Sequence, residues 1–95
     1  MNEKQKLVLK VYVNGMTQAA RTAIENLEEV CLEYRDQIEY SIEVIDIRKH
    51  PDLAEKDRII ATPTVIKQLP PPMRRIIGDL SEREPLLAGL DLLEG

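Results

Sequence analysis

Residues 61–81, ATPTVIKQLPPPMRRIIGDLS, decide the second half of the fold. Residues 62–68 and 73–77 each predict a short strand, because both are rich in β-branched side chains. Pro70-Pro71-Pro72 separates them as a rigid break without amide donors, and Gly78-Asp79 turns the chain afterwards. The two strands are joined so closely that we expect them to pair antiparallel.

The first half of the chain predicts a strand, a helix and a second strand. Residues 6–13, KLVLKVYV, are apolar on both faces apart from Lys10, which is typical of a central strand. Residues 17–35 place apolar side chains at three- and four-residue steps, with Thr17 as the N-cap. Residues 38–47 alternate as a strand until Val44-Ile45, where we expect either burial on both faces or a bulge.

Two further helices complete the pattern. Pro51 suits the first position of a short helix that runs to about Ile59. Ser81 and Glu84 have the spacing of a capping box for a last helix. Pro85 falls inside the first turn of that helix or just beyond it, where it removes a donor and is expected to weaken the start. That helix carries four leucines: Leu86, Leu87, Leu90 and Leu93. The order β-α-β-α-β-β-α predicts an α/β, thioredoxin-like fold, and 95 residues predict a single domain spanning 1–95.

Composition excludes several classes of function. A net charge of -4 argues against nucleic-acid binding. No apolar run approaches the ~20 residues that span a bilayer, and the first residues form no signal peptide, so we expect no membrane contact and a cytoplasmic protein. Cys31 and His50 are the only cysteine and histidine, too few for a structural metal site. We expect no metal, no cofactor and no catalytic residue.

A thioredoxin-like enzyme holds its two cysteines where the first strand meets the first helix. Here that junction reads Asn14-Gly15-Met16-Thr17, and Cys31 falls on the apolar stripe of the helix, where it is interpreted as a small core residue. Pro63 begins the third strand, where thioredoxin-like domains resemble this chain in carrying a proline that is usually cis. The sequence leaves a cis and a trans bond open.

Lys67, Arg74 and Arg75 surround the rigid prolines. In an acidic chain, such a basic group could bind an acidic patch of a partner. Ordinary solvated charge is the alternative.

The stretch from Ala61 to Ser81 resembles the circadian clock protein family KaiB. So do three further stretches: residues 10–15 (KVYVNG), residues 44–47 (VIDI) with PDLAEKDRIIATPT from Pro51, and residues 89–93 (GLDLL). The resemblance covers about residues 6–93.

The resemblance implies a non-enzymatic regulator that binds the N-terminal ATPase ring of KaiC, a hexameric ATPase. It also implies a metamorphic chain. The resting form would be a tetramer or dimer with the order βαββααβ, and the monomer that binds KaiC would be thioredoxin-like, βαβαββα. A sensor histidine kinase with a similar domain would compete for KaiC, and clock members sequester KaiA.

Individual positions follow from the same resemblance. Gly89 and Asp91 fall where substitutions tip the balance between the two folds, and Lys67, Arg74 and Arg75 fall at partner or subunit contacts.

Three positions depart from clock members: Leu7 and Glu94 stand where these have Tyr, and Glu43 stands where they have Lys. The acidic tail is also missing. These departures put KaiA binding in doubt and leave a KaiA-less, stress-related KaiB–KaiC pair open. The remaining alternatives are a thioredoxin-like redox protein and the sensor domain of a histidine kinase.

Overall fold

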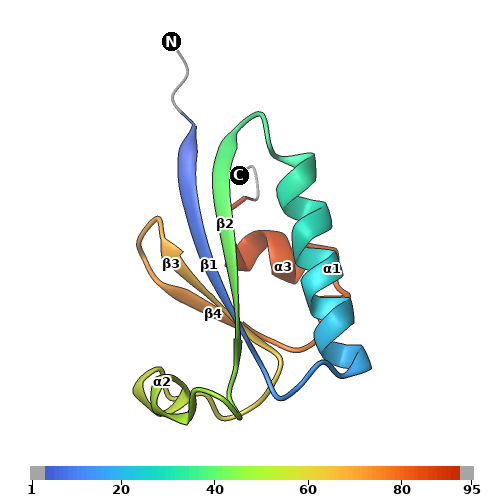
Figure 1. Ribbon diagram of the computed structural model, residues 1–95. Helices are drawn as coiled ribbons and strands as arrows, with labels where there is room; N and C mark the ends of the chain where they lie inside the picture. Colours follow the sequence, from blue (N-terminus) through green and yellow to red (C-terminus); the bar gives the residue numbers. More distant parts are fainter. Residues whose placement is uncertain (1–3, 93–95) are drawn as a thin grey trace.

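The computed structural model describes residues 4–92 and arranges them as three helices on a four-stranded sheet (Figure 1). The elements are β1 (Gln5–Val13), α1 (Gln18–Glu33), β2 (Ile38–Asp46), α2 (Pro51–Lys56), β3 (Thr64–Leu69), β4 (Arg74–Ile77) and α3 (Arg83–Gly89). The strands lie in the order β2-β1-β3-β4. β1 is parallel to β2, and β3 is antiparallel to both β1 and β4, as the pattern βαβαββα predicts.

β1 is the central strand that its two apolar faces predict. Leu7, Leu9, Val11 and Val13 are buried in the main core with side chains of α1 and α3. Tyr12 points to the opposite face and is fully buried there. The strand therefore contributes to two separate clusters.

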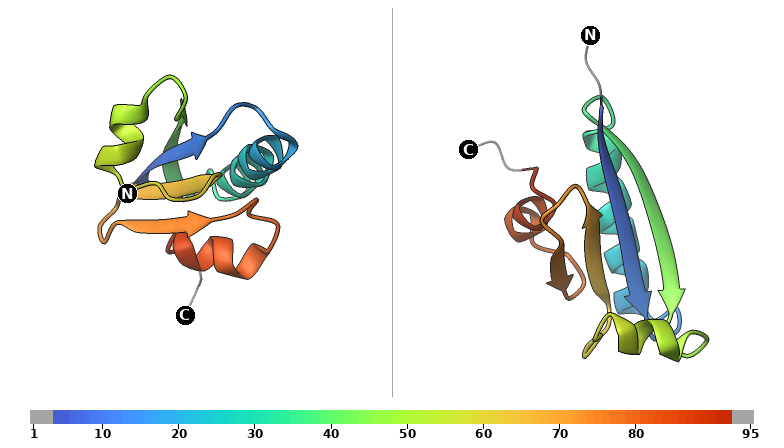
Figure 2. Two further views of the ribbon diagram at one scale, coloured as in Figure 1. Left: turned by 90° about the horizontal axis from the view of Figure 1, so that it is seen from below. Right: turned by 90° about the vertical axis from the view of Figure 1, so that its left-hand side faces the viewer.

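α1 forms where the periodicity predicts it. Thr17 is its N-cap, and its hydroxyl accepts a hydrogen bond from the Ala20 amide at 3.1 Å. The buried stripe consists of Ala20, Ala23, Leu27, Val30 and Cys31. α1 and α3 cover the same face of the sheet (Figure 2).

The far end of β2 has neither the bulge nor the double burial expected from Val44-Ile45. Its register against β1 is continuous from Ile38 to Asp46. Ile45 is buried, whereas Val44 is 45% exposed. β2 is an edge strand, and at this end only the face that carries Ile45 is covered.

α2 provides that cover and creates a second, smaller core. Tyr12, Ile45 and Ile66 are buried there, packed against partly buried side chains that include Leu53 and Ala54. α2 lies at one end of the sheet face opposite α1 (Figures 1 and 2). It ends at Lys56, earlier than predicted, because Arg58 has φ 53°, which an α-helix cannot contain.

The capping box predicted at Ser81 does not form. α3 begins at Arg83 with Glu82 as an N-cap that makes no side-chain capping bond. The Ser81 amide instead donates to the Asp79 carboxylate at 3.1 Å, and the chain passes inward through buried Leu80 at φ 62° before the helix starts. Pro85 is the third helical residue, where a missing N–H costs no helical bond. Leu93 and Glu94 lie outside the described residues.

Between residues 4 and 92, no helix is long and apolar enough to cross a membrane.

Candidate functional site

Lys67 is the most unexpected of the predicted site residues. It was expected to join an exposed basic group around the prolines, but its side chain is fully buried, so that expectation is wrong. β3 lies inside the sheet, and Lys67 points from it toward the face that α3 covers. Its ammonium donates to the carboxylate of Asp91, which is the counter-ion such burial requires.

Asp91 occupies the turn that ends α3. Its amide donates to Ala88 O at 3.1 Å, and the Leu92 amide donates to Leu87 O at 2.8 Å. These two bonds and φ 59° at Asp91 form a Schellman motif, in which aspartate tolerates the left-handed conformation better than most residues. The turn thereby directs the carboxylate at Lys67.

Arg74 completes an ion cluster on the same side. Its Nε donates to Asp91 Oδ1 at 2.9 Å from β4. The hydrogen bonds from Lys67 and Arg74 lower the pKa of Asp91, so that the carboxyl is ionised at neutral pH. The cluster joins β3, β4 and the end of α3.

Gly89 lies within the same region and lets β4 approach α3 closely. A Cβ at this position would lie 2.4 Å from Cδ1 and 2.5 Å from Cγ1 of Ile76. Four of the five predicted positions are therefore brought together: Lys67, Arg74, Gly89 and Asp91.

Arg75 is the exception. Alternation along β4 turns it to the opposite face, where its guanidinium donates to Arg58 O at 3.0 Å and Asp57 O at 2.7 Å. It therefore contacts the end of α2 and not the ion cluster.

Pro63 is buried at the start of β3, and the Thr62–Pro63 peptide bond is cis. Its carbonyl accepts the Gly78 amide at 3.0 Å, which joins the start of β3 to the end of β4. The Leu69–Pro70 and Pro71–Pro72 bonds are also cis.

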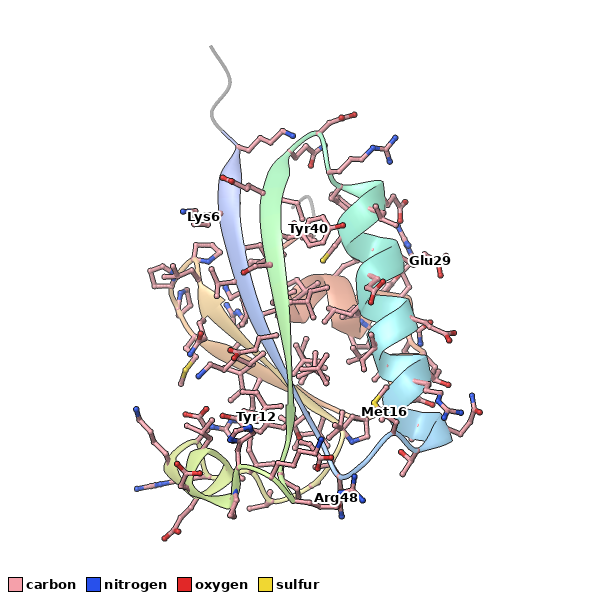
Figure 3. The ribbon with its side chains drawn as sticks, in the orientation of Figure 1. Lys6, Tyr12, Met16, Glu29, Tyr40 and Arg48 are labelled. Carbon is pink, nitrogen blue, oxygen red and sulfur yellow. The ribbon has the colours of Figure 1, made fainter. Side chains whose placement is uncertain are left out.

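The junction of β1 and α1 holds an ion pair in the place of a dithiol. Asp46 accepts from the Gly15 amide at 3.3 Å and from Arg48 Nη2 at 2.8 Å, and the hydrogen bonds from Arg48 hold the pKa of that carboxyl well below its usual range. Arg48 lies against Gly15, and half-exposed Met16 follows (Figure 3). Nothing at this junction can form a disulfide.

Cys31 is fully buried in α1, as interpreted from the sequence. Burial raises the pKa of its thiol to about 11, so the nucleophilic thiolate is scarce at neutral pH. Residues 4–92 also contain no cluster of histidine, cysteine and carboxylate side chains that could hold a metal ion.

A second polar cluster was not predicted from the sequence. Buried Tyr12 donates its hydroxyl to the carboxylate of Asp57, and Lys10 Nζ lies 3.8 Å from the same carboxylate. The available signal was Lys10 and Tyr12, two residues apart with polar ends on one face of an otherwise apolar strand.

Comparisons with known proteins agree on a family. The family model described as "KaiB domain" matches residues 10–92. The circadian clock oscillator protein KaiB of Prochlorococcus marinus (strain NATL2A) is 53% identical over 93 residues, which cover 98% of this chain and 86% of that protein. The protein of the same name from Trichodesmium erythraeum (strain IMS101) is 54% identical over 90 residues, covering 95% and 86%.

Solved structures of lower identity share the fold. The N-terminal domain of Synechococcus elongatus SasA superposes with a TM-score of 0.77 at 22% identity, covering 100% of this chain and 92% of that one. Mitochondrial thioredoxin 3 from Saccharomyces cerevisiae gives a TM-score of 0.71 at 17% identity, covering 97% and 82%. At these identities, the likeness establishes a thioredoxin-like fold and nothing more.

Proposed function

This chain belongs to the KaiB family, and from that premise we propose that it is a regulatory protein that binds the N-terminal ATPase ring of a KaiC-type hexamer. The observation that carries the proposal is the thioredoxin-like arrangement itself. The family resemblance assigns this arrangement to the KaiC-binding monomer and a different one to the resting oligomer. On this proposal, the arrangement in Figure 1 is the binding form.

Buried Lys67 and its counter-ion make a contact that belongs to this arrangement of the second half. Their pairing requires β3 and the end of α3 to meet, so it exists only when the second half is packed as here. An arrangement that separates these elements must give Lys67 another environment, since an unpaired buried ammonium is costly. Lys67, Arg74 and Asp91 therefore act as determinants of the binding form, rather than as a surface that touches the partner.

We also propose that a sensor histidine kinase with a domain of this fold competes for the ring. The likeness in fold to the SasA N-terminal domain, over 92% of that domain, supports this. Two domains of one fold can present the same edges to one ATPase ring. A KaiA-less system remains part of the proposal, on the departures at Leu7 and Glu43.

A redox function is disfavoured by Cys31. Its thiol is buried, its pKa is raised to about 11, and the β1–α1 junction contains no cysteine. An insulin-reduction assay tests this alternative. Reductase activity that disappears in Cys31→Ser would support a redox protein and contradict a purely regulatory role.

The binding proposal is tested with a KaiC-type ATPase. We expect fluorescently labelled protein to associate with the isolated N-terminal ring, and Cys31→Ser to associate equally well. The apparent affinity should rise in any variant that enlarges the thioredoxin-like fraction, because that fraction scales the observed dissociation constant. If the monomer fails to associate with the ring, the proposed function is wrong, whatever the family.

A further inference from the structure

α2 is a weakly supported element that nevertheless covers the second core. It has six residues, none of them buried, whereas a helix of this length is unstable alone in water. The side chains that it covers, Tyr12, Ile45 and Ile66, are buried. Contacts outside the helix must therefore hold it in place.

Asp57, at the C-cap of α2, makes one set of these contacts. Its carboxylate accepts a hydrogen bond from the Tyr12 hydroxyl, which also lies 3.4 Å from Leu53 O. Lys10 Nζ is 3.8 Å away, and both charged side chains are about one-fifth exposed. The negative end of the helix dipole disfavours a carboxylate at this place, so Asp57 is held there by its two partners on β1.

Tyr12 acts in this cluster as a hydrogen-bond donor. Burial, and then the hydrogen bond to Asp57, raise its pKa far above the ordinary value, so the phenol keeps its proton. Figure 3 shows Tyr12 beside α2 and away from α1. A neutral phenol between a strand and a helix end joins the two elements and has no part in proton transfer.

Arg75 makes the second set of contacts, from β4. Its two guanidinium nitrogens donate to the carbonyls of Asp57 and Arg58, at 2.7 and 3.0 Å. Carbonyls at the end of a helix have no helical donor, and a cation there also suits the dipole. Arg75 thus caps the C-terminal end of α2 from β4, which is an edge strand of the sheet.

We propose that Tyr12, Lys10, Asp57 and Arg75 form a latch that fastens the end of α2 to β1 and β4 together, so that α2 is held most firmly while β4 is in place. The latch rests on the proposed function in one respect: it is the device that selects the binding arrangement over the resting one. When β4 leaves the sheet, Arg75 leaves with it, and the end of α2 loses both donors to its carbonyls. Only the contacts with β1 then hold α2, so its cover over the second core weakens and the residues after α2 can repack more easily.

Hydrogen exchange of the α2 amides tests the latch without any partner. The reporters are Ala54 and Asp57, whose amides bond to His50 O at 3.2 Å and Leu53 O at 3.0 Å. In Tyr12→Phe and Asp57→Ala, we expect these amides to exchange about tenfold faster while α1 amides keep their rates, because a hydrogen bond to a charged group is lost. Tyr40→Phe, on the other face of the sheet, and Glu55→Gln, on the exposed side of α2, are the matched controls.

Arg75→Gln tests the link across the sheet. It should also accelerate exchange in α2, although Arg75 lies on a different strand. The double variant Tyr12→Phe/Asp57→Ala should exceed neither single variant by much, because both remove the same bond. Unchanged α2 exchange in all three single variants would overturn the latch. Faster exchange in the Tyr12 and Asp57 variants with unchanged exchange in Arg75→Gln would show that β4 has no part in holding α2, and would overturn the proposed link to β4.

Size exclusion of the same variants tests the selection of an arrangement. The latch variants should contain less monomer than the controls at equal concentration. Faster α2 exchange without a change in the monomer fraction would overturn selection by the latch. Failure of the wild-type protein to bind a KaiC-type ring would contradict the proposed function and leave the exchange result standing.

Discussion

At the scale of single residues, Lys67 and Asp91 depend on each other unequally. Lys67 is fully buried, whereas the Asp91 side chain is 32% exposed and has Arg74 as a second partner. Loss of the carboxylate leaves an ammonium without water or counter-charge. Loss of the ammonium leaves a carboxylate that keeps one partner and some solvent.

We therefore expect Asp91→Asn to destabilise the monomer more than Lys67→Met. The expected loss in Asp91→Asn is about 2 kcal/mol, below the usual cost of breaking a buried pair because Asp91 is partly exposed. Urea unfolding at a concentration where the chain is monomeric measures both. Equal losses, or a larger loss in Lys67→Met, would mean that Lys67 does not depend on this counter-ion.

The same pair predicts a dependence on acid. The folded pKa of Asp91 is lowered, chiefly by the hydrogen bond from Lys67, so its contribution to stability is complete above the unfolded pKa and lost as pH falls below it. The unfolded value is about 4, so the loss belongs to the range below about pH 4. The difference in unfolding free energy between wild type and Asp91→Asn should shrink in that range. A difference that stays constant down to about pH 3 would assign the effect to another group.

At the scale of elements, the contact of α3 with β4 depends on the absence of a side chain at Gly89. An alanine there would gain about 1 kcal/mol of helix propensity, but its Cβ would overlap Ile76. Ile76 has to rotate or move, and repacking of that kind costs about 1–3 kcal/mol. The two effects oppose each other in the native background.

Truncation of the Ile76 side chain at its Cβ should separate the gain in helix propensity from the cost of the overlap. The Ile76 Cβ lies 3.9 Å from the position that the new methyl would take, an ordinary contact. Gly89→Ala should therefore stabilise the Ile76→Ala variant by about 1 kcal/mol and give no such gain in the native background. Thermal unfolding of the four proteins completes the cycle. The same gain in both backgrounds would show that Ile76 does not limit position 89.

At the scale of the whole molecule, the most exposed large apolar side chains of residues 4–92 lie in the second half. Ile60 is 89% exposed, Met73 61% and Ile77 55%. A small domain with a modest core gains from covering such side chains, at about 1.5–3 kcal/mol for each one fully buried. This distribution favours a resting oligomer in which the second half is more deeply covered than it is here.

We expect Met73→Ser and Ile77→Ser to shift the oligomer toward monomer in light scattering over a concentration series. Leu32→Ser is the matched control, because Leu32 is 50% exposed but lies on α1 in the first half. A strict monomer in the wild-type protein at every concentration would refute the resting oligomer. An equal shift in Leu32→Ser would show that the second half has no special part in it.

The sequence by itself determined the elements and their order. Three kinds of local signal were enough: the spacing of apolar residues, every two in strands and every 3.6 in helices, the N-cap at Thr17, and the breaks between elements. The breaks lie at Asn14-Gly15, Pro70–Pro72 and Gly78-Asp79, and the structure contains the elements that these signals predict. Membership of the KaiB family was also readable, because the matching stretches are contiguous. The start of α3 was predicted wrongly, since the Ser81–Glu84 spacing is local but the path of the chain there is set by burial of Leu80.

Only the tertiary structure decided what the polar side chains do. Lys67 meets Asp91 across 24 residues, Tyr12 meets Asp57 across 45, and Arg75 binds a helix end that lies 18 residues earlier. A charged residue on a strand has the same sequence pattern whether it is solvated or buried. Such a side chain is buried where a distant segment covers it and supplies a counter-ion, and it is solvated where no segment covers it. Lys67 and Arg75, predicted together as a basic group, therefore lie on opposite faces of the sheet. Lys67 pairs with Asp91 on the face that α3 covers, and Arg75 binds the carbonyls at the C-terminal end of α2 on the other face.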